Sequence, residues 1–394
     1  MLKGKTVVLG VTGSIAAYKI ANLARMLVKQ HCEVHVLMTQ NATNFINPIT
    51  FETLTKHKCL IDTFDRNFEF SVEHVALAKA ADVVMIAPAS ANVIGKIANG
   101  IADDMLTTTV MACPCKKIVS PAMNHNMFHN PIVQDNIEKL KHYGYEIVEP
   151  AHGMLANGDM GDGRMPDEEL LFEYIVKEIA FEKDMTGKKV LVTAGATVEA
   201  IDPVRFITNH SSGKMGFALA KNAMLRGADV TLVMGKCDSE PPVFVNTVKV
   251  QSAKDMYDAV IERADSMDII VKAAAVADYR PKNVSSEKVK KQDGNMSIEL
   301  ELTDDILKTL GERKNGQFIC GFSMETENML ENSKKKLEKK NCDMIVANNL
   351  KQNGAGFGGN TNIVTLITKD DEVQLEKMTK DEVAEKIFDF ILSR

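Results

Sequence analysis

Short apolar runs alternate with amphipathic segments along most of the chain, in the order strand, helix, strand. Residues 3–13 (KGKTVVLGVTG) run through β-branched residues to a glycine, and residues 186–195 (TGKKVLVTAG) repeat this pattern. A helical pattern follows each run; in the first copy Ala16, Ile20, Leu23 and Leu27 share one helical face. Because strand–helix–strand units with short connections form parallel sheets, the sequence predicts an α/β protein with two doubly wound, Rossmann-like domains.

The segment between the two copies is charged and loosely patterned (KEIAFEKDMTGKK, residues 177–189). A chain of 394 residues is also too long for one ordinary hydrophobic core. We therefore expect one domain over residues 1–182 and another over residues 186–394.

Composition narrows the class of protein. Apolar residues make up 45% of the chain and charged residues 25%, as in soluble globular proteins, and the net charge of −6 disfavours a general binder of nucleic acid or membrane surfaces. The amino terminus has no signal-peptide pattern and no apolar run reaches a membrane-spanning length, so we expect a cytoplasmic protein. The seven scattered cysteines then predict reduced thiols, and their spacing does not complete a zinc site.

Doubly wound sheets bind ligands beyond the carboxyl ends of their strands. Gly13-Ser14, between the first strand and helix, can offer N–H groups and a hydroxyl to a phosphate, although such a pair is also an ordinary helix cap. The GAGFGG stretch (354–359) matches a dinucleotide-binding pattern but leads into a strand, so it predicts a hairpin loop. The SSGKMG stretch lacks the first glycine of a P-loop, because Thr208 stands there.

Longer motifs carry a more specific signal. The first half contains VEHVALAKAAD (72–82), APASANVIGKIANGIADDML (87–106), PAMNHNM (121–127) and LANGDMGDGRM (155–165). Together they resemble the flavin-dependent cysteine decarboxylase family, in particular phosphopantothenoylcysteine decarboxylase. The second half contains DPVRFITNHSSGKMG (202–216), AAAVADYRP (273–281), EKVKKQ (287–292) and GFSMET (321–326), and it resembles phosphopantothenate–cysteine ligase.

The first resemblance implies a flavin that acts as the electron sink for decarboxylation, with the protein supplying orientation, a base and an acid. By the family's pattern His74 is the base and Asn124 binds the substrate carboxylate. Without the motifs, these residues would be interpreted as a helix-face histidine and a turn-capping asparagine. The expected FMN contacts are Gly13, Ser14, Ile15, Thr39, Ala87, Pro88, Ala89, Ser90, Asn92 and Ala122.

The second resemblance implies CTP with Mg²⁺ and an acyl-cytidylate that Asn209 holds for attack by cysteine. The sequence does not indicate which residues bind the metal. Expected CTP contacts are Lys272, Ala273, Ala274, Asp278, Lys288, Asp304, Asp305, Ile306, Leu307, Phe322, Lys336 and Lys340. Alone, EKVKK is typical of a solvated surface run and KKKLEKK of an exposed helix face.

The glycine-studded stretch LANGDMGDGRM predicts a mobile surface loop, and it resembles the family's substrate-covering flap. The family usually has a cysteine where this chain has Asn157, and that cysteine is assigned as the acid that protonates the enethiol intermediate. An amide has no dissociable proton near neutral pH. Either the intermediate is trapped, or a water, Cys113 or Asp159 donates the proton instead, or the flap takes no part in the chemistry. We expect decarboxylation with slow final reduction.

The sequence therefore predicts a bifunctional enzyme of coenzyme A biosynthesis. It would ligate 4′-phosphopantothenate to L-cysteine and decarboxylate the product to 4′-phosphopantetheine. The resemblance also implies a homo-oligomer with trimeric flavin domains and dimeric ligase domains. The alternatives are a flavin reductase or NAD(P) enzyme on the same folds, and a non-catalytic flavin-binding subunit.

Overall fold

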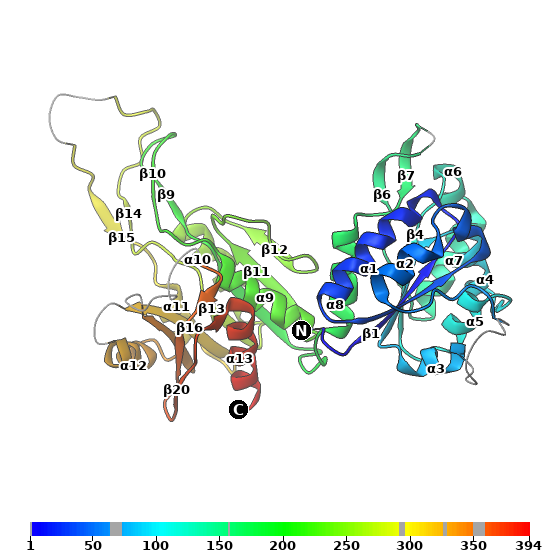
Figure 1. Ribbon diagram of the computed structural model, residues 1–394. Coiled ribbons are helices and arrows are strands. Elements are labelled where there is room, and N and C mark those ends of the chain that lie inside the picture. The colour runs from blue at the N-terminus through cyan, green and yellow to red at the C-terminus, as the bar shows by residue number, and fades with distance from the viewer. Residues whose placement is uncertain (1, 64–72, 157, 291–295, 326–328, 350–358) are drawn as a thin grey trace. The chain divides into compact units, whose positions relative to one another are not determined.

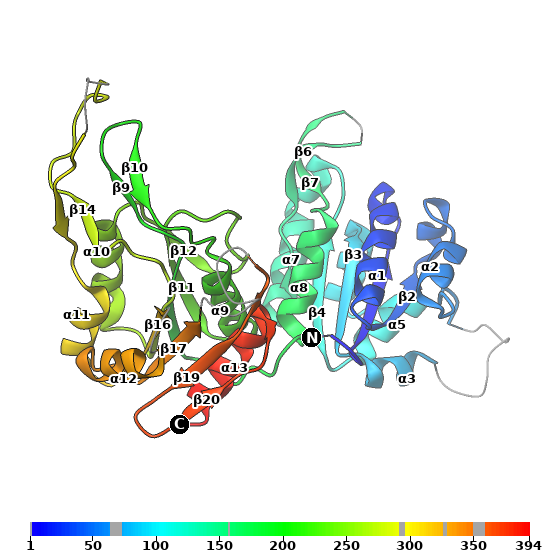
Figure 2. The same ribbon diagram turned by 60° about the vertical axis from the view of Figure 1, so that its left-hand side comes forward.

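The computed structural model describes residues 2–63, 73–156, 158–290, 296–325, 329–349 and 359–394. The chain divides into two compact units, Met1–Phe181 and Glu182–Arg394. Each unit places a mainly parallel sheet between layers of helices (Figures 1 and 2). Among the described residues, no helix is long and apolar enough to cross a lipid bilayer.

Five parallel strands form the main sheet of the first unit, in the order β2-β1-β3-β4-β5. They are β1 (Thr6–Val11), β2 (Glu33–Met38), β3 (Val83–Ala89), β4 (Lys116–Pro121) and β5 (Glu146–Ile147). The winding reverses between β1 and β3, and a doubly wound sheet binds its ligand at the carboxyl ends of the strands beside that point.

Helices cover both faces of this sheet. A hydrophobic core lies under α3 (Glu73–Ala80), α4 (Ala91–Ala98), α5 (Met105–Ala112) and α7 (Pro131–His142). On the other face α1 (Lys19–Lys29) packs against α8 (Glu168–Ile179). The unit also contains η1 (Ile15–Tyr18), η2 (Gln40–Asn44), α2 (Pro48–Thr55), α6 (His125–Phe128) and an antiparallel hairpin of β6 (Ala151–Met154) and β7 (Met160–Arg164).

The main sheet of the second unit has eight strands in the order β12-β11-β8-β13-β16-β17-β19-β20. The first six strands are parallel, and the last two pairings, β17 with β19 and β19 with β20, are antiparallel. The winding reverses between β8 and β13. The strands are β8 (Lys189–Ala194), β11 (Asp229–Met234), β12 (Asn246–Lys249), β13 (Ile269–Lys272), β16 (Phe318–Glu325), β17 (Met344–Asn349), β19 (Val364–Ile367) and β20 (Glu372–Gln374).

One face of this sheet carries α10 (Ala253–Ala264), α11 (Ile306–Glu312) and α12 (Met329–Lys339) over a shared core. On the other face α9 (Lys214–Leu225) packs against α13 (Lys380–Leu392). Two antiparallel ribbons extend from the unit: β9 (Val198–Ala200) with β10 (Phe206–Thr208), and β14 (Tyr279–Pro281) with β15 (Leu300–Leu302). A short pair, β18 (Thr361–Asn362) and β21 (Met378–Thr379), completes the unit.

The predicted fold class is confirmed, with one correction in each unit. The stretch 155–165 is not wholly a loop, because Met160–Arg164 forms β7 and pairs with β6. In the second unit the sheet ends in antiparallel strands rather than continuing in parallel. Both features depend on pairing between segments, which the pattern of a single segment does not report. The predicted hairpin loop at 354–359 lies, except for Gly359, outside the described residues.

Candidate functional site

A cavity of about 590 Å³ lies at the carboxyl ends of β1, β3 and β4 in the first unit. Glycine, alanine, serine and methionine dominate its wall, which leaves room for a flat apolar group. Six of the residues predicted from the sequence to contact flavin or substrate line this cavity: Gly13, Ser14, Ile15, Ser90, Ala122 and Asn124.

The turn after β1 has little space for larger side chains. A Cβ on Gly13 would lie 2.8 Å from the Cβ of Asn41, so the position favours glycine. The Ser14 hydroxyl caps η1 by accepting the Ala16 N–H at 3.3 Å. Thr12 then fastens the turn to β3, because its hydroxyl donates to the Pro88 carbonyl at 2.6 Å and accepts the Ser90 N–H at 2.9 Å. Both strand ends are therefore held rigidly beside the cavity.

Thr39 ends β2 beside this turn, and its hydroxyl is buried. Within the part of the chain that the structure describes, the Thr39 Oγ1 has no hydrogen-bond partner. A buried polar atom without a partner is uncommon and points to a group that binds there. Ala87, Pro88 and Ala89 form the buried end of β3, and Asn92 is exposed on α4; like Thr39, none of these four residues lines the cavity. The five predicted contacts that do line the cavity, with the buried Thr39 hydroxyl, fit a flavin.

The substrate-side residues are placed differently. Asn124 lines the cavity and caps α6, where its Oδ1 accepts the Asn126 N–H at 2.9 Å. The amide Nδ2 is not used by this cap and can donate to a carboxylate. His74 lies on α3, half-buried, and is not a lining residue. Asn157 lies outside the described residues, although the adjacent Ala156 lines the cavity.

A pocket of about 460 Å³ lies in the second unit, beyond the carboxyl end of β13. It brings together residues from three segments that are far apart in the sequence. Eight predicted nucleotide contacts line it: Lys272, Asp278, Asp304, Asp305, Ile306, Leu307, Lys336 and Lys340.

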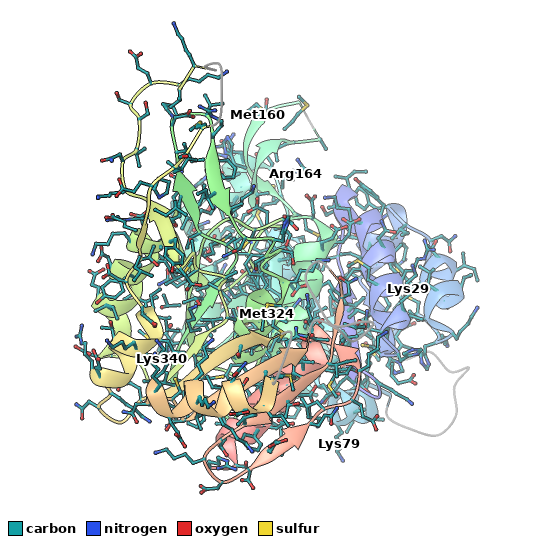
Figure 3. The ribbon with its side chains drawn as sticks, turned by 90° about the vertical axis from the view of Figure 1, so that its left-hand side faces the viewer. Lys29, Lys79, Met160, Arg164, Met324 and Lys340 are labelled. Carbon is teal, nitrogen blue, oxygen red and sulfur yellow. The ribbon has the colours of Figure 1, made fainter. Side chains whose placement is uncertain are left out.

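Two of the three lysines that line this pocket are held in place, one by a hydrogen bond and one by an ion pair. Lys336 donates to the carbonyl of Phe322 at 3.0 Å, and Lys340, labelled in Figure 3, pairs with Asp305. Asp305 also caps α11 by accepting the Lys308 N–H at 2.9 Å. Burial, followed by the Lys336 ammonium, lowers the pKa of Lys272 to about 8. An anion in the pocket would relieve this crowding of positive charge.

Two family models match the chain. The flavoprotein family matches residues 1–180, and the DNA/pantothenate metabolism flavoprotein C-terminal domain matches residues 185–394. The coenzyme A biosynthesis bifunctional protein CoaBC of Bacillus subtilis is 48% identical over 373 residues, which cover 94% of this chain and 92% of that protein. The chain belongs to the family of bifunctional coenzyme A biosynthesis proteins.

Other relatives have similar length. The protein of the same name from Vibrio cholerae is 42% identical, over 99% of this chain and 98% of its own. A cysteine/cysteine sulfinic acid decarboxylase from an unknown prokaryotic organism is 43% identical, over 88% of this chain and 99% of its own. The resemblance found in the sequence is thus confirmed: this family member is a bifunctional enzyme with a decarboxylase in its flavoprotein domain and a ligase.

In this family member, several residues predicted for the ligase site lie outside the pocket. Lys288 is exposed. The segment that carries it is held by a hydrogen bond from the Val289 N–H to the Asp202 carboxylate at 3.1 Å. Asn209 donates to the carbonyl of Ala275, beyond β13, at 3.2 Å. Ala273 and Ala274 follow β13 directly but do not line the pocket. Of the residues predicted for the ligase site, one group therefore lines the pocket and the other lies outside it.

Sequence reasoning missed two cations in the decarboxylase cavity. Lys19 lines it and pairs with Asp167 at 2.9 Å. Arg164 of β7, labelled in Figure 3, also lines it, as does Gly163. The available signal was an arginine inside a glycine-rich stretch. Of the alternative proton donors, Cys113 is buried at the end of α5 and precedes β4, so it lies at the sheet edge opposite the cavity.

Proposed function

We propose that the second unit joins 4′-phosphopantothenate to L-cysteine with CTP and Mg²⁺, and that the first unit decarboxylates the product with FMN to give 4′-phosphopantetheine. The observation that carries the ligase assignment is the convergence of Lys272, Lys336 and Lys340 on one pocket that also contains three aspartates. A triphosphate with its metal needs several cations and a carboxylate in this arrangement.

In the ligase step the phosphopantothenate carboxylate attacks the α-phosphate of CTP, and pyrophosphate leaves. The cysteine amine then attacks the acyl-cytidylate, forms the amide and releases CMP. Lys272, Lys336 and Lys340 would neutralise the phosphates, and Asp278 or Asp304 would offer an oxygen to Mg²⁺. Asn209 would hold the acyl group beside Ala275, and Lys288 would approach from its exposed segment.

In the decarboxylase step FMN supplies reversible hydride transfer, and the chain supplies the cavity and the proton-transfer groups. Gly13, Ser14 and Ser90 would contact the cofactor, and so would the buried hydroxyl of Thr39. The Nδ2 of Asn124 would bind the substrate carboxylate. Arg164 and Lys19 add positive charge on the same wall, where an anionic substrate would enter.

We further propose that the chain works as a homo-oligomer. The two ribbons of the ligase unit expose apolar side chains, including Val204 at 57%, Leu300 at 45% and Leu302 at 72%. A second copy would cover these side chains.

In the first unit His74 does not line the cavity of its own chain. For His74 to act as the base, it would have to reach the cavity of a neighbouring copy. A monomeric mass in light scattering with flavin bound would contradict this arrangement.

The function is tested by incubating the protein with 4′-phosphopantothenate, cysteine, CTP and Mg²⁺ and analysing the products by mass. We expect pyrophosphate and CMP first, and then loss of CO₂. Omitting CTP should stop the first step, while added phosphopantothenoylcysteine should still be decarboxylated. Because one relative is a cysteine/cysteine sulfinic acid decarboxylase, free cysteine is the matched control substrate. Faster CO₂ release from free cysteine than from the conjugate would contradict the proposed substrate.

A further inference from the structure

Three histidines and one aspartate meet where the β6–β7 hairpin contacts α6, beside the decarboxylase cavity. His129 Nε2 lies 2.9 Å from one oxygen of Asp162, and His152 Nδ1 lies 2.9 Å from the other. The rings of His125 and His129 are in edge contact, 4.4 Å between centroids. Ligand atoms of His125, His129 and Asp162 all lie within 4.8 Å of one another.

The backbone of the hairpin is built to present Asp162 to these histidines. Pairing between β6 and β7 shifts by one residue between Ala151–Arg164 and Gly153–Gly161, so Asp162 and Gly163 together oppose the single residue His152. Such a bulge turns the side chain beside it out of the regular alternation. Gly163 has a φ of +119°, and a Cβ there would lie 2.3 Å from the carbonyl oxygen of Met123. The bulge therefore requires glycine at position 163, so the bulge is encoded in the sequence of the hairpin.

The cluster joins two separate elements. Met123 N–H donates to the Gly163 carbonyl at 3.1 Å, and Asp162 N–H donates to His125 Nδ1 at 3.1 Å. Asn124 and Met127 of the α6 segment and Arg164 of the hairpin all line the cavity. Stronger bonds within the cluster would therefore hold the α6 wall of the cavity against the hairpin wall.

Imidazole and carboxylate groups in this combination are ligands for divalent transition metals. Two histidines with one carboxylate form a known three-ligand set, with the remaining positions left to water. The Asp162 carboxylate accepts hydrogen bonds from His152 Nδ1 and His129 Nε2, so each of its two oxygens already faces an imidazole nitrogen of the cluster. Asp162 and His129 are partly exposed, which gives an ion access.

We propose that His125, His129 and Asp162 bind one divalent transition-metal ion, for which Zn²⁺ is the probe, and that the bound ion ties the hairpin to α6. His152 is a positioning residue: it donates to the second oxygen of Asp162 and orients the carboxylate. His125 exchanges its hydrogen bond with the Asp162 N–H for a bond to the ion. This inference does not rest on the proposed ligase or decarboxylase substrates.

The site is tested with the full-length, flavin-loaded, tag-free protein, by titrating Zn²⁺ against a chromophoric chelator. We expect one ion per chain, with affinity reduced at least tenfold in both Asp162→Asn and His129→Asn. His152→Asn should also reduce it, by about tenfold, the lower end of what residues that orient a metal ligand contribute. Matched controls are His142→Asn, exposed at the end of α7, and His57→Asn, which removes a separate histidine–glutamate pair.

A second readout follows the hairpin itself. Zn²⁺ should slow tryptic cleavage after Arg164 several-fold in the unaltered chain, and a chelator should restore the rate. The effect should vanish in His129→Asn, which leaves the β6–β7 sequence unchanged and so serves if Asp162→Asn folds poorly. Unaltered affinity in both cluster variants, loss of affinity in His57→Asn instead, or cleavage indifferent to Zn²⁺ would overturn the proposal.

Discussion

The two cavities of this protein occupy equivalent places in two similar sheets, yet their walls differ in kind. The first lies at the carboxyl ends of β1, β3 and β4 and is lined chiefly by small and methionine side chains. The second lies beyond β13 and is lined by three lysines and three aspartates. The sheet decides where a ligand binds, and the loops that follow its strands decide which chemistry is available.

This difference matches the two reactions. A flavin needs a rigid, largely apolar slot with a few oriented polar groups, because the cofactor itself carries the redox chemistry. A nucleotide triphosphate needs fixed cations, because its reaction is accelerated by positioning and charge neutralisation. If the two walls are specialised in this way, each activity can be removed without the other.

The largest effect should come from removing a pocket lysine. Lys336→Met keeps most of the side-chain length but removes the ammonium, and we expect pyrophosphate release to fall about 100-fold, as for loss of one fixed donor. Bound flavin should be unchanged. Lys339→Met, an exposed lysine on the same helix, is the matched control.

Lys288→Gln sharpens the same comparison, because Lys288 is exposed and outside the lined pocket. We expect this variant also to lose CTP-dependent pyrophosphate release while it retains flavin. A rate equal to that of the unaltered chain would remove Lys288 from the site.

A substitution in the first cavity should have the converse effect, loss of flavin with the ligase activity retained. Gly13→Val places new atoms against Asn41, where even a Cβ would lie 2.8 Å from the neighbouring Cβ. Overpacking of about 1–3 kcal/mol weakens binding roughly 5- to 150-fold, so flavin absorbance after dialysis should drop while pyrophosphate release persists. Gly95→Ala on α4, whose Cβ would be 3.8 Å from Asn136, should keep its flavin. Loss of both activities in Gly13→Val would mean that the units are not independent.

Substitution of Asn157 by cysteine should have a smaller effect than the changes above, and it should raise activity where they lower it. If a cysteine at this position supplies the proton for the enethiol, Asn157→Cys should accelerate 4′-phosphopantetheine formation and flavin reoxidation. A positioned acid contributes about 100-fold or more, and a water donor recovers part of this, so we expect roughly tenfold. Asn157→Ser has similar size without an acidic thiol and should stay slow. Equal rates in all three proteins, measured by stopped-flow absorbance, would show that another donor already serves.

The smallest effect is a pH dependence confined to the second cavity. Lys272 has a pKa lowered to about 8, and only its protonated form attracts the triphosphate. Binding an anion raises that pKa, so affinity is complete below pH 8 and falls as the pH rises through it. The Kd for CTP should increase about threefold between pH 7.5 and 8.5. Lys272→Arg should give a flat profile, whereas an equally flat profile in the unaltered chain would contradict the assignment.

Periodicity was sufficient to place most strands and helices, because burial of alternating or helical faces is a local property. The predicted helical face is an example: Ile20, Leu23 and Leu27 of α1 are fully buried, although the fourth member, Ala16, lies in η1 and is half-buried. The same reasoning missed that Met160–Arg164 is a strand, since its glycines and aspartate do not alternate in polarity. That strand exists because it pairs with β6 and docks on Met123, contacts made by residues distant in the sequence.

By itself, the sequence determined the α/β class, the family and the segments that carry the chemistry, because motifs and periodicity are written in consecutive residues. Only the tertiary structure decided which of those segments converge. It brought Lys272, Asp305 and Lys336 into one pocket, and it left His74 and Lys288 outside the lined cavities. It also assembled His125, His129 and Asp162 across a hairpin and a helix. The physical reason is that distances between side chains depend on how strands and helices pack, and a linear pattern does not contain those distances.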